Sequence, residues 1–248
     1  MTAVPRRSGP AREHDVRRVR DLVRAAILRL DFPDGALPGE GELMLSHGVG
    51  RATVRAALAM LRDEGLIERT QGVGTHVVVH TVTTHLDEAH GAAEPGLDSV
   101  LNRRMRPRVL DRSVIPLPST VANRLGVAPG VPCLRLEYIG LLEDEPMVVA
   151  TNYALFPEAD RLVDAPFVSD WYALLADAGI ELGDSEFLLG GMAADELTAR
   201  LLEIPEHTPL LAIEQVISDP TGRPFDFAVI LHRSDRFLFR SKAWRRRP

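Results

Sequence analysis

The chain contains 248 residues, of which 45% are hydrophobic and 26% charged, and these proportions are those of a globular protein large enough for two domains. No apolar run approaches the roughly 20 residues that span a bilayer, and the N-terminus lacks the apolar core of a signal peptide, so we expect a cytoplasmic protein without a membrane partner. The single cysteine, Cys133, excludes an internal disulfide and a multi-cysteine metal site, and the sequence indicates no cofactor.

The charge is distributed unevenly along the chain. The net charge is −6, yet residues 1–80 carry 12 arginines against 10 acidic side chains and therefore have a charge of +2. The remaining residues carry −8. Because DNA repels an acidic surface, this asymmetry favours a DNA-binding head on an acidic regulatory body.

The N-terminal part has the spacing of three helices. Residues 1–13 are rich in Arg, Pro and Gly, so we expect order to begin at about residue 14. Apolar side chains then recur every three or four positions from Val16 to Leu30, which predicts an amphipathic helix. The glycine and proline residues that follow predict a short helix at Glu40–His47, a turn at Gly48–Gly50 and a third helix at about Arg51–Glu64.

The third helix combines a buried stripe with a polar N-terminal end. Val54 and Leu58 lie on the stripe, so Arg51, Thr53 and Arg55 are expected to project away from the core. For an isolated helix, a solvated face would be the simpler interpretation of these arginines. The short preceding helix, the tight turn and the segment that follows instead favour contact with duplex DNA.

That following segment reads as a basic hairpin. Leu66–Ile67 begin its first strand and Thr75–Val79 form its second, while Gly72 and Gly74 allow the tip to turn and to approach a phosphate backbone closely. The whole arrangement predicts a winged helix-turn-helix domain.

This segment resembles the DNA-binding domain of the GntR family of bacterial transcription regulators, over about residues 14–79. The family pattern combines a leucine-proline motif that ends in glutamate, a recognition helix with Arg, Thr and Arg, and a Gly-Leu-Ile sequence before a Gly-x-Gly-Thr wing. The matching residues are Leu37-Pro38-Gly39-Glu40, Arg51, Thr53, Arg55, Gly65-Leu66-Ile67, Arg69 and Gly72-Val73-Gly74-Thr75.

The resemblance implies a set of DNA contacts from the recognition helix and the wing. Its members are Arg51, Thr53, Arg55, Arg69, Gln71, Gly72, Gly74 and Thr75. Two positions depart from the family pattern, because Gly41 replaces a common Arg and Gly50 a common Ser. A phosphate or base contact and a helix cap are therefore expected to be missing.

Residues 80–98 are polar and contain few large apolar side chains, so they are expected to form an irregular linker between a domain at 1–79 and a second domain at 99–248. The spacing of His76, His80, His85 and His90 raises the possibility of a metal site. No cysteine or compact carboxylate motif accompanies these histidines, so we favour the absence of a metal site.

The second domain mixes strands and helices. Strands are predicted at Arg108–Ile115, Pro132–Leu142, Pro146–Leu155, Ser185–Met192, Pro209–Ser218 and Pro224–Arg233. Helices are predicted at about 119–125, 169–178 and 194–202. Because most strands follow one another as hairpins, an antiparallel sheet with helices packed on it is expected, which makes the fold class α+β.

This order is similar to that of the UTRA domain, the effector-binding module of the HutC-type branch of the GntR family, whose fold is shared with chorismate lyase. The resemblance covers about residues 95–240. The matching residues are Ile115-Pro116, Val121-Ala122, Leu125-Gly126, Glu145-Pro146, Gly222-Arg223-Pro224 and Arg233-Ser234-Asp235-Arg236-Phe237. The resemblance implies an effector-binding and dimerisation domain.

The resemblance also bears on the effector. Members that bind phosphorylated sugars carry arginines at the positions of Tyr138 and Gly140, so a sugar phosphate is disfavoured here. Strand alternation places Arg135 on the opposite face from Tyr138. We expect a less acidic or cationic ligand, with contacts from Tyr138, Tyr153, Ser169, Asp226, His232 and Arg233. Each has a structural alternative, such as cross-strand packing for Tyr138 or an ion-pair corner for Arg233.

The leading interpretation is a homodimeric repressor whose two heads read a palindromic operator and whose small-molecule effector changes the affinity for DNA. One alternative is a chorismate-lyase-like enzyme, but the sequence contains no glycine-serine elbow, metal signature or phosphate-binding loop, and no catalytic residue is assigned. Another is a ligand-binding module with a degenerate DNA-binding head, which Gly41 and Gly50 would explain.

Overall fold

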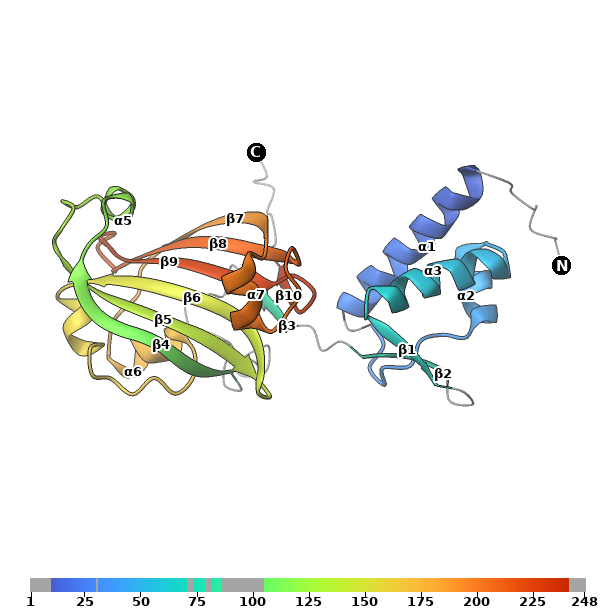
Figure 1. Ribbon diagram of the computed structural model, residues 1–248, viewed down its shortest axis with the longest axis horizontal. Helices are drawn as coiled ribbons and strands as arrows, with labels where there is room; N and C mark the ends of the chain where they lie inside the picture. The colour runs from blue at the N-terminus through green and yellow to red at the C-terminus, as the bar shows by residue number, and fades with distance from the viewer. Residues whose placement is uncertain (1–9, 30, 71–73, 79–81, 86–104, 241–248) are drawn as a thin grey trace, which may run out of the picture. The chain divides into compact units, whose positions relative to one another are not determined.

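The computed structural model describes residues 10–29, 31–70, 74–78, 82–85 and 105–240. The chain forms two compact units, Met1–Thr81 and Val82–Pro248 (Figure 1). The first is a helical unit with a small wing and the second is built on an antiparallel sheet, which confirms the predicted α+β class. Among the described residues, no helix combines the length and the apolar character needed to cross a bilayer.

Three helices and a two-stranded wing make up the first unit. Its elements are α1 (Pro10–Leu28), α2 (Glu40–His47), α3 (Arg51–Asp63), β1 (Ile67–Thr70) and β2 (Gly74–Val77). The buried stripes of the helices meet in one apolar cluster that includes Val23, Leu43 and Val54, and Leu66 and Ile67 extend this cluster into the wing. The α1 helix begins at Pro10, so the expected start of order at about residue 14 is wrong. Proline suits the first helical turn because its missing N–H has no helical partner there.

Glycines form the turns that set α3 beside α2 and the wing. Gly48 ends α2 in the left-handed region with φ of 63°, and the Val49 N–H donates to the Met44 carbonyl. Gly65 follows α3 with φ of 70°. In the wing, antiparallel pairing joins Ile67 to Val77 and continues to the strand ends.

The second unit is built on a six-stranded sheet. Its strand order is β4-β5-β6-β9-β8-β7, and all of its pairs are antiparallel. The strands are β4 (Met105–Pro116), β5 (Pro132–Leu142), β6 (Glu145–Leu155), β7 (Ser185–Ala193), β8 (Pro209–Ser218) and β9 (Pro224–Arg233). The helical elements are α5 (Ser119–Leu125), η2 (Glu158–Arg161), α6 (Trp171–Asp177) and α7 (Glu196–Leu202).

Helices cover both faces of this sheet (Figure 1). On one face, Leu136 and Tyr138 of β5 pack against a cluster that includes Trp171 of α6, and we call this the α6 face. On the other, Cys133 packs with α5 and Ile139 packs with α7, and we call this the α7 face. Successive residues of a strand point to opposite faces, so the register of the strands assigns each sheet residue to one of them.

A short parallel strand pair completes the second unit. β3 (Val82–His85) pairs with β10 (Phe237–Arg240), with Val82 beside Phe237. The expectation that residues 80–98 are irregular throughout is therefore wrong, because four of them form a strand. Sequence pattern missed this strand because it is short and its partner lies more than 150 residues further along the chain.

Candidate DNA-binding surface and effector site

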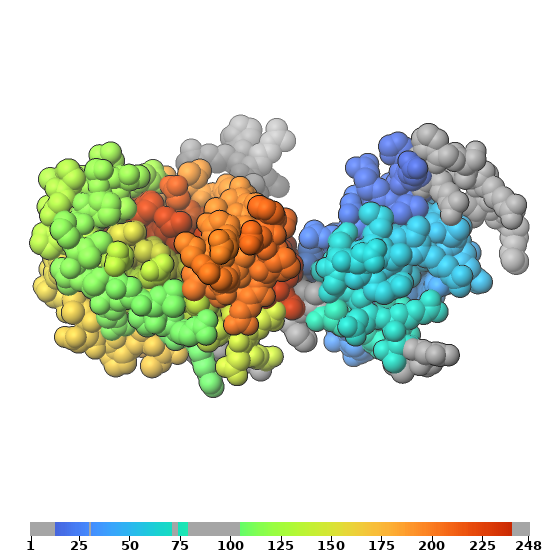
Figure 2. Space-filling view, in the orientation of Figure 1, coloured from blue at the N-terminus to red at the C-terminus, as the bar shows by residue number. Residues whose placement is uncertain are grey.

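Three arginines converge at the N-terminal end of α3. The side chains of Arg51, Arg55 and Arg69 are 65%, 60% and 59% exposed. Each has a side-chain nitrogen within 4 Å of the carboxylate of Glu40, at 3.8, 3.0 and 3.5 Å respectively. Figure 2 shows the cyan and turquoise residues of α3 and the wing over much of the visible surface of the first unit. Two elements, the helix and the wing, thus present cations to the same side.

Thr53 does not project with these arginines. Its side chain lies among the buried residues of α3 and the residue is 7% exposed, so the expectation that it points away from the core is wrong. The reason is helical spacing, because Thr53 precedes the fully buried Ala57 by four positions and shares its face. The core stripe of this helix is wider than the predicted one.

The wing contributes residues on both sides of its tip. Arg69 pairs with Thr75 across the two strands, and the Thr75 carbonyl accepts a hydrogen bond from the Leu37 N–H at 2.9 Å. Gly74 is exposed with φ of 127°, a conformation that favours glycine. The predicted contacts Gln71 and Gly72 lie outside the described residues.

Both departures from the family pattern occupy open space. Gly50 caps α3 without a side-chain hydrogen bond, and Gly41 lies in the first turn of α2. A Cβ added at either position meets nothing within 4 Å. A Cβ therefore fits at both positions, so a clash at that atom does not explain these glycines.

The Gly41→Arg variant is expected to bind operator DNA about tenfold more tightly than the wild type, because it adds one cation beside the arginine cluster at a position with room for it. Fluorescence anisotropy with a labelled operator duplex measures the change. Gly41→Ala is the matched control, since it improves helix propensity by roughly 0.5–1 kcal/mol without adding charge. Equal operator affinity of the two variants would contradict the missing contact.

The second unit holds a buried carboxyl group on its α6 face. Asp226 of β9 is 0% exposed, and the Nδ2 group of Asn152 in β6 donates to its two oxygens at 3.1 and 3.4 Å. Burial raises the pKa of Asp226 to about 8, and the hydrogen bonds from Asn152 only partly offset this rise. A buried carboxyl group with a raised pKa is a candidate for a functional site.

Aromatic and polar side chains share the α6 face with this carboxyl group. Tyr138 is 6% exposed, and Phe167 packs on its ring edge-on with 4.8 Å between ring centroids. Burial raises the pKa of Tyr138, and the charges of Asp170 and Asp226 raise it further. The Gln215 amide donates to the hydroxyl group of Tyr172, whose pKa burial raises to about 12. We call this group the Asp226 cluster, and it comprises Tyr138, Asn152, Phe167, Ser169, Asp170, Trp171, Tyr172, Gln215 and Asp226.

The start of α6 places Ser169 and Asp170 in the cluster. Asp170 caps the helix by accepting the Ala173 N–H at 3.0 Å, and the Ser169 hydroxyl donates to Asp170 at 3.3 Å. Burial raises the pKa of Asp170 despite these hydrogen bonds. Tyr138, Ser169 and Asp226 are the predicted effector residues that the structure brings together.

His232 shares the α6 face but lies far from Asp226. The two residues are six positions apart on one strand, which corresponds to about 20 Å. His232 stacks instead on Phe237 of β10, with 3.8 Å between ring centroids, and burial lowers its pKa to about 3. The expectation that His232 and Asp226 line one pocket is therefore wrong.

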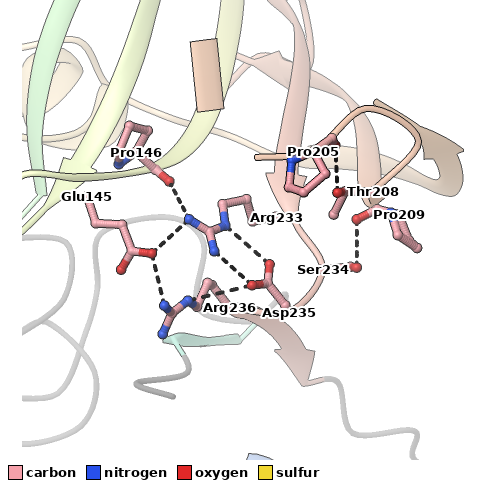
Figure 3. Close-up of polar contacts among 9 residues, drawn as sticks. All are labelled: Glu145, Pro146, Pro205, Thr208, Pro209, Arg233, Ser234, Asp235 and Arg236. Atoms are coloured by element: carbon pink, nitrogen blue, oxygen red, sulfur yellow. Dashed lines mark hydrogen bonds and ion pairs between the residues drawn. The ribbon is translucent and has the colours of Figure 1, made fainter. Parts of the chain in front are cut away.

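Tyr153 and Arg233 lie on the other face. Tyr153 pairs with Arg135, so it faces α5 and not Tyr138, and the predicted grouping of the two tyrosines is wrong. Arg233 is held by Glu145 at 2.8 Å and by Asp235 at 2.8 Å (Figure 3). Arg236 contacts the same two acids. Arg233 thus belongs to an ion-pair corner, the structural alternative that the sequence left open.

Sequence reasoning missed seven residues of these sites. Glu40 organises the arginines, and six residues complete the Asp226 cluster: Asn152, Phe167, Asp170, Trp171, Tyr172 and Gln215. A polar residue inside an apolar strand was the available signal for Asn152 and Gln215. Glu40 stood in the leucine-proline motif, but the motif alone did not reveal its three partners.

Comparison with known proteins agrees with both halves of the structure. Residues 16–77 match the model of the bacterial regulatory proteins of the gntR family, and residues 101–238 match the UTRA domain. The chain is 27% identical to the HTH-type transcriptional regulator GgaR of Escherichia coli K12, over 89% of this chain and 86% of that protein. It is 28% identical to the HTH-type transcriptional repressor NagR of Bacillus subtilis, over 84% and 85% of the two chains.

The fold has a counterpart among solved structures. The crystal structure of PhnF from Mycobacterium smegmatis superposes with a TM-score of 0.62 at 22% identity, and the match covers 91% of this chain and 99% of that one. The winged arrangement, the antiparallel sheet and both domain matches thus agree along the chain. The protein belongs to the GntR family of bacterial transcription regulators, as a DNA-binding member that carries a UTRA domain.

Proposed function

We propose that the protein is a homodimeric repressor that reads a two-fold symmetric operator and is released from it by a small molecule. The observation that carries the DNA-binding part is the convergence of Arg51, Arg55 and Arg69 from α3 and the wing. Recognition helices of two copies would enter successive major grooves, and Gly74 and Thr75 of each wing would approach the backbone. The repressor named NagR among its relatives supports the sign of regulation.

Both edges of the six-stranded sheet support association with a second copy. β7 forms one edge and exposes Leu188 and Met192, while β4 forms the other and exposes Val114. Exposed apolar side chains on edge strands are surfaces that a partner covers. Analytical ultracentrifugation is expected to give twice the chain mass of 27.3 kDa.

The Asp226 cluster is the proposed effector site, and its chemistry favours a neutral or cationic ligand that donates hydrogen bonds. The cluster contains no cationic side chain that would pair with a phosphate, and burial favours the protonated form of both of its carboxyl groups. Arg112 of β4 lies on the same face as the cluster. Its guanidinium already donates hydrogen bonds to the carbonyls of Val163 and Ala165, and so it holds the adjoining loop. A side chain at Gly140 would require its neighbours to shift, because an added Cβ would lie 2.4 Å from the end of the Met105 side chain and 2.6 Å from Cγ1 of Val148.

Isothermal titration of the full-length protein with matched metabolites tests this effector class. An amino sugar, its N-acetylated form and their 6-phosphates form one set, and aliphatic amines form a second. We expect binding to the unphosphorylated amines and release of operator DNA by the same compounds. Tight binding confined to the phosphates would overturn the proposed ligand class.

A mobility shift with the DNA upstream of the protein's own gene tests the regulator proposal against its alternatives. A specific shift is expected. Its absence with every ligand that binds would favour an enzyme or a module with a degenerate head.

A further inference from the structure

Glu40 is the shared partner of the three arginines that the proposed function assigns to DNA. It is the first residue of α2, and its side chain is 20% exposed, far less than those of its three partners. Its position is well fixed, because Glu42 of the same turn accepts the Gly39 N–H at 2.8 Å in a capping interaction. The carboxylate therefore has a defined place from which to hold mobile arginine side chains.

The atoms that meet in this contact matter for DNA recognition. The Nε of Arg55 donates to both oxygens of Glu40, at 3.1 and 3.0 Å, and Arg51 also approaches through its Nε. Because these contacts use Nε, they leave the two terminal amino groups of each guanidinium to other partners. A fork of two amino groups is what binds the O6 and N7 atoms of guanine. Glu40 thus contacts Arg51 and Arg55 on the side of the guanidinium that this base contact does not use, whereas Arg69 meets Glu40 through its Nη1 at 3.5 Å.

The stability of the fold does not account for this arrangement. Ion pairs between exposed groups contribute about 0–1 kcal/mol, and all three arginines are more than half exposed. Three neighbouring cations repel one another, however, and a central carboxylate reduces that repulsion. The same carboxylate repels a phosphate group that approaches the cluster.

We propose that Glu40 is a positioning residue that sets DNA specificity. It holds the arginines in place for base contacts in the operator, and it weakens their attraction to the phosphates of any sequence. Non-specific binding rests on phosphate contacts alone, whereas operator binding also gains base contacts. Glu40 therefore lowers non-specific affinity more than operator affinity and raises the ratio between the two.

Glu40→Gln tests this role in the full-length protein, with Asp63→Asn as the matched control. Asp63 is exposed at the far end of α3, so its replacement changes the net charge equally. Anisotropy titrations with operator and scrambled duplexes, each over a range of salt concentrations, give both affinities. For Glu40→Gln we expect a specificity ratio about tenfold lower and a salt dependence steeper by about one phosphate contact. The same ratio for both variants would overturn the proposal.

Two further variants separate position from charge and from the underlying proposal. Glu40→Asp keeps the charge but shortens the side chain, so it is expected to lose most of the specificity ratio as well; a wild-type ratio would contradict positioning. Arg55→Ala is measured alongside. If it retains full operator affinity, the assignment of Arg55 to DNA is what fails. If it loses affinity while Glu40→Gln behaves like Asp63→Asn, only the role of Glu40 fails.

Discussion

Replacement of Arg51 or Arg55 by alanine is expected to remove most of the specific operator binding and to leave the protein folded. Each lost bidentate base contact costs roughly 1–3 kcal/mol, and a symmetric dimer loses one at each half-site, so either replacement removes roughly 2–6 kcal/mol of the about 4–10 kcal/mol by which specific binding exceeds non-specific binding. The fold should tolerate both changes because the two side chains are 65% and 60% exposed and their ion pairs with Glu40 are weak.

Anisotropy with an operator duplex and a scrambled duplex measures this loss, and thermal unfolding verifies the fold. Arg62→Ala is the matched control, because Arg62 is exposed on the same helix near its C-terminal end. It should retain operator affinity. Wild-type affinity of Arg51→Ala and Arg55→Ala would refute α3 as the recognition helix.

The Asp226→Asn variant is expected to be more stable than the wild type at pH 8, by about 3–5 kcal/mol, and to lose its response to effector. The pKa of Asp226 is about 8 in the folded protein and near 3.8 in an unfolded chain. Between these values the folded state holds a proton that the unfolded state has released. The free energy of unfolding of the wild type therefore falls as the pH rises from about 4 to 8.

Denaturant unfolding at pH 5 and pH 8 measures this dependence. Asparagine keeps the shape of the side chain and removes its ionisation, so the variant should lose most of the fall between the two pH values. Asp177→Asn, at the exposed end of α6, is the control and should behave like the wild type. A wild-type pH dependence in Asp226→Asn would show that this carboxyl group is not the buried acid described here. Effector binding is the role that we propose for this buried group.

Local patterns predicted most of the fold. The short α2 helix and the β5 strand have the predicted bounds because glycines, prolines and apolar periodicity mark their ends. The sheet face to which each residue of a single strand points was also predictable, and Arg135 does point to the opposite face from Tyr138. The exposure of Arg51 and Arg55 was predicted for the same reason, since they lie off the buried stripe of α3, whereas Arg69 was named only through the family resemblance.

The effector site was less predictable because its residues meet through tertiary packing. Asn152 of β6 donates a hydrogen bond to Asp226 of β9, although the two residues are 74 positions apart in the sequence. Trp171 belongs to a separate helix. Tyr153 was misplaced because the relative faces of β5 and β6 depend on register, which one sequence does not state. The sequence shows that Asp226 and His232 are six residues apart. These six residues correspond to a long distance only because they lie in one extended strand.

The pairing of β3 with β10 has a practical consequence for experiments on the protein. These strands begin and end the described part of the second unit, and they run in the same direction, so His85 lies beside Arg240. Removal of residues 237–240 would take away the whole partner of β3, the first strand of the second unit, together with the Phe237 ring that stacks on His232. A shortened protein for binding experiments should therefore keep the chain through Arg240.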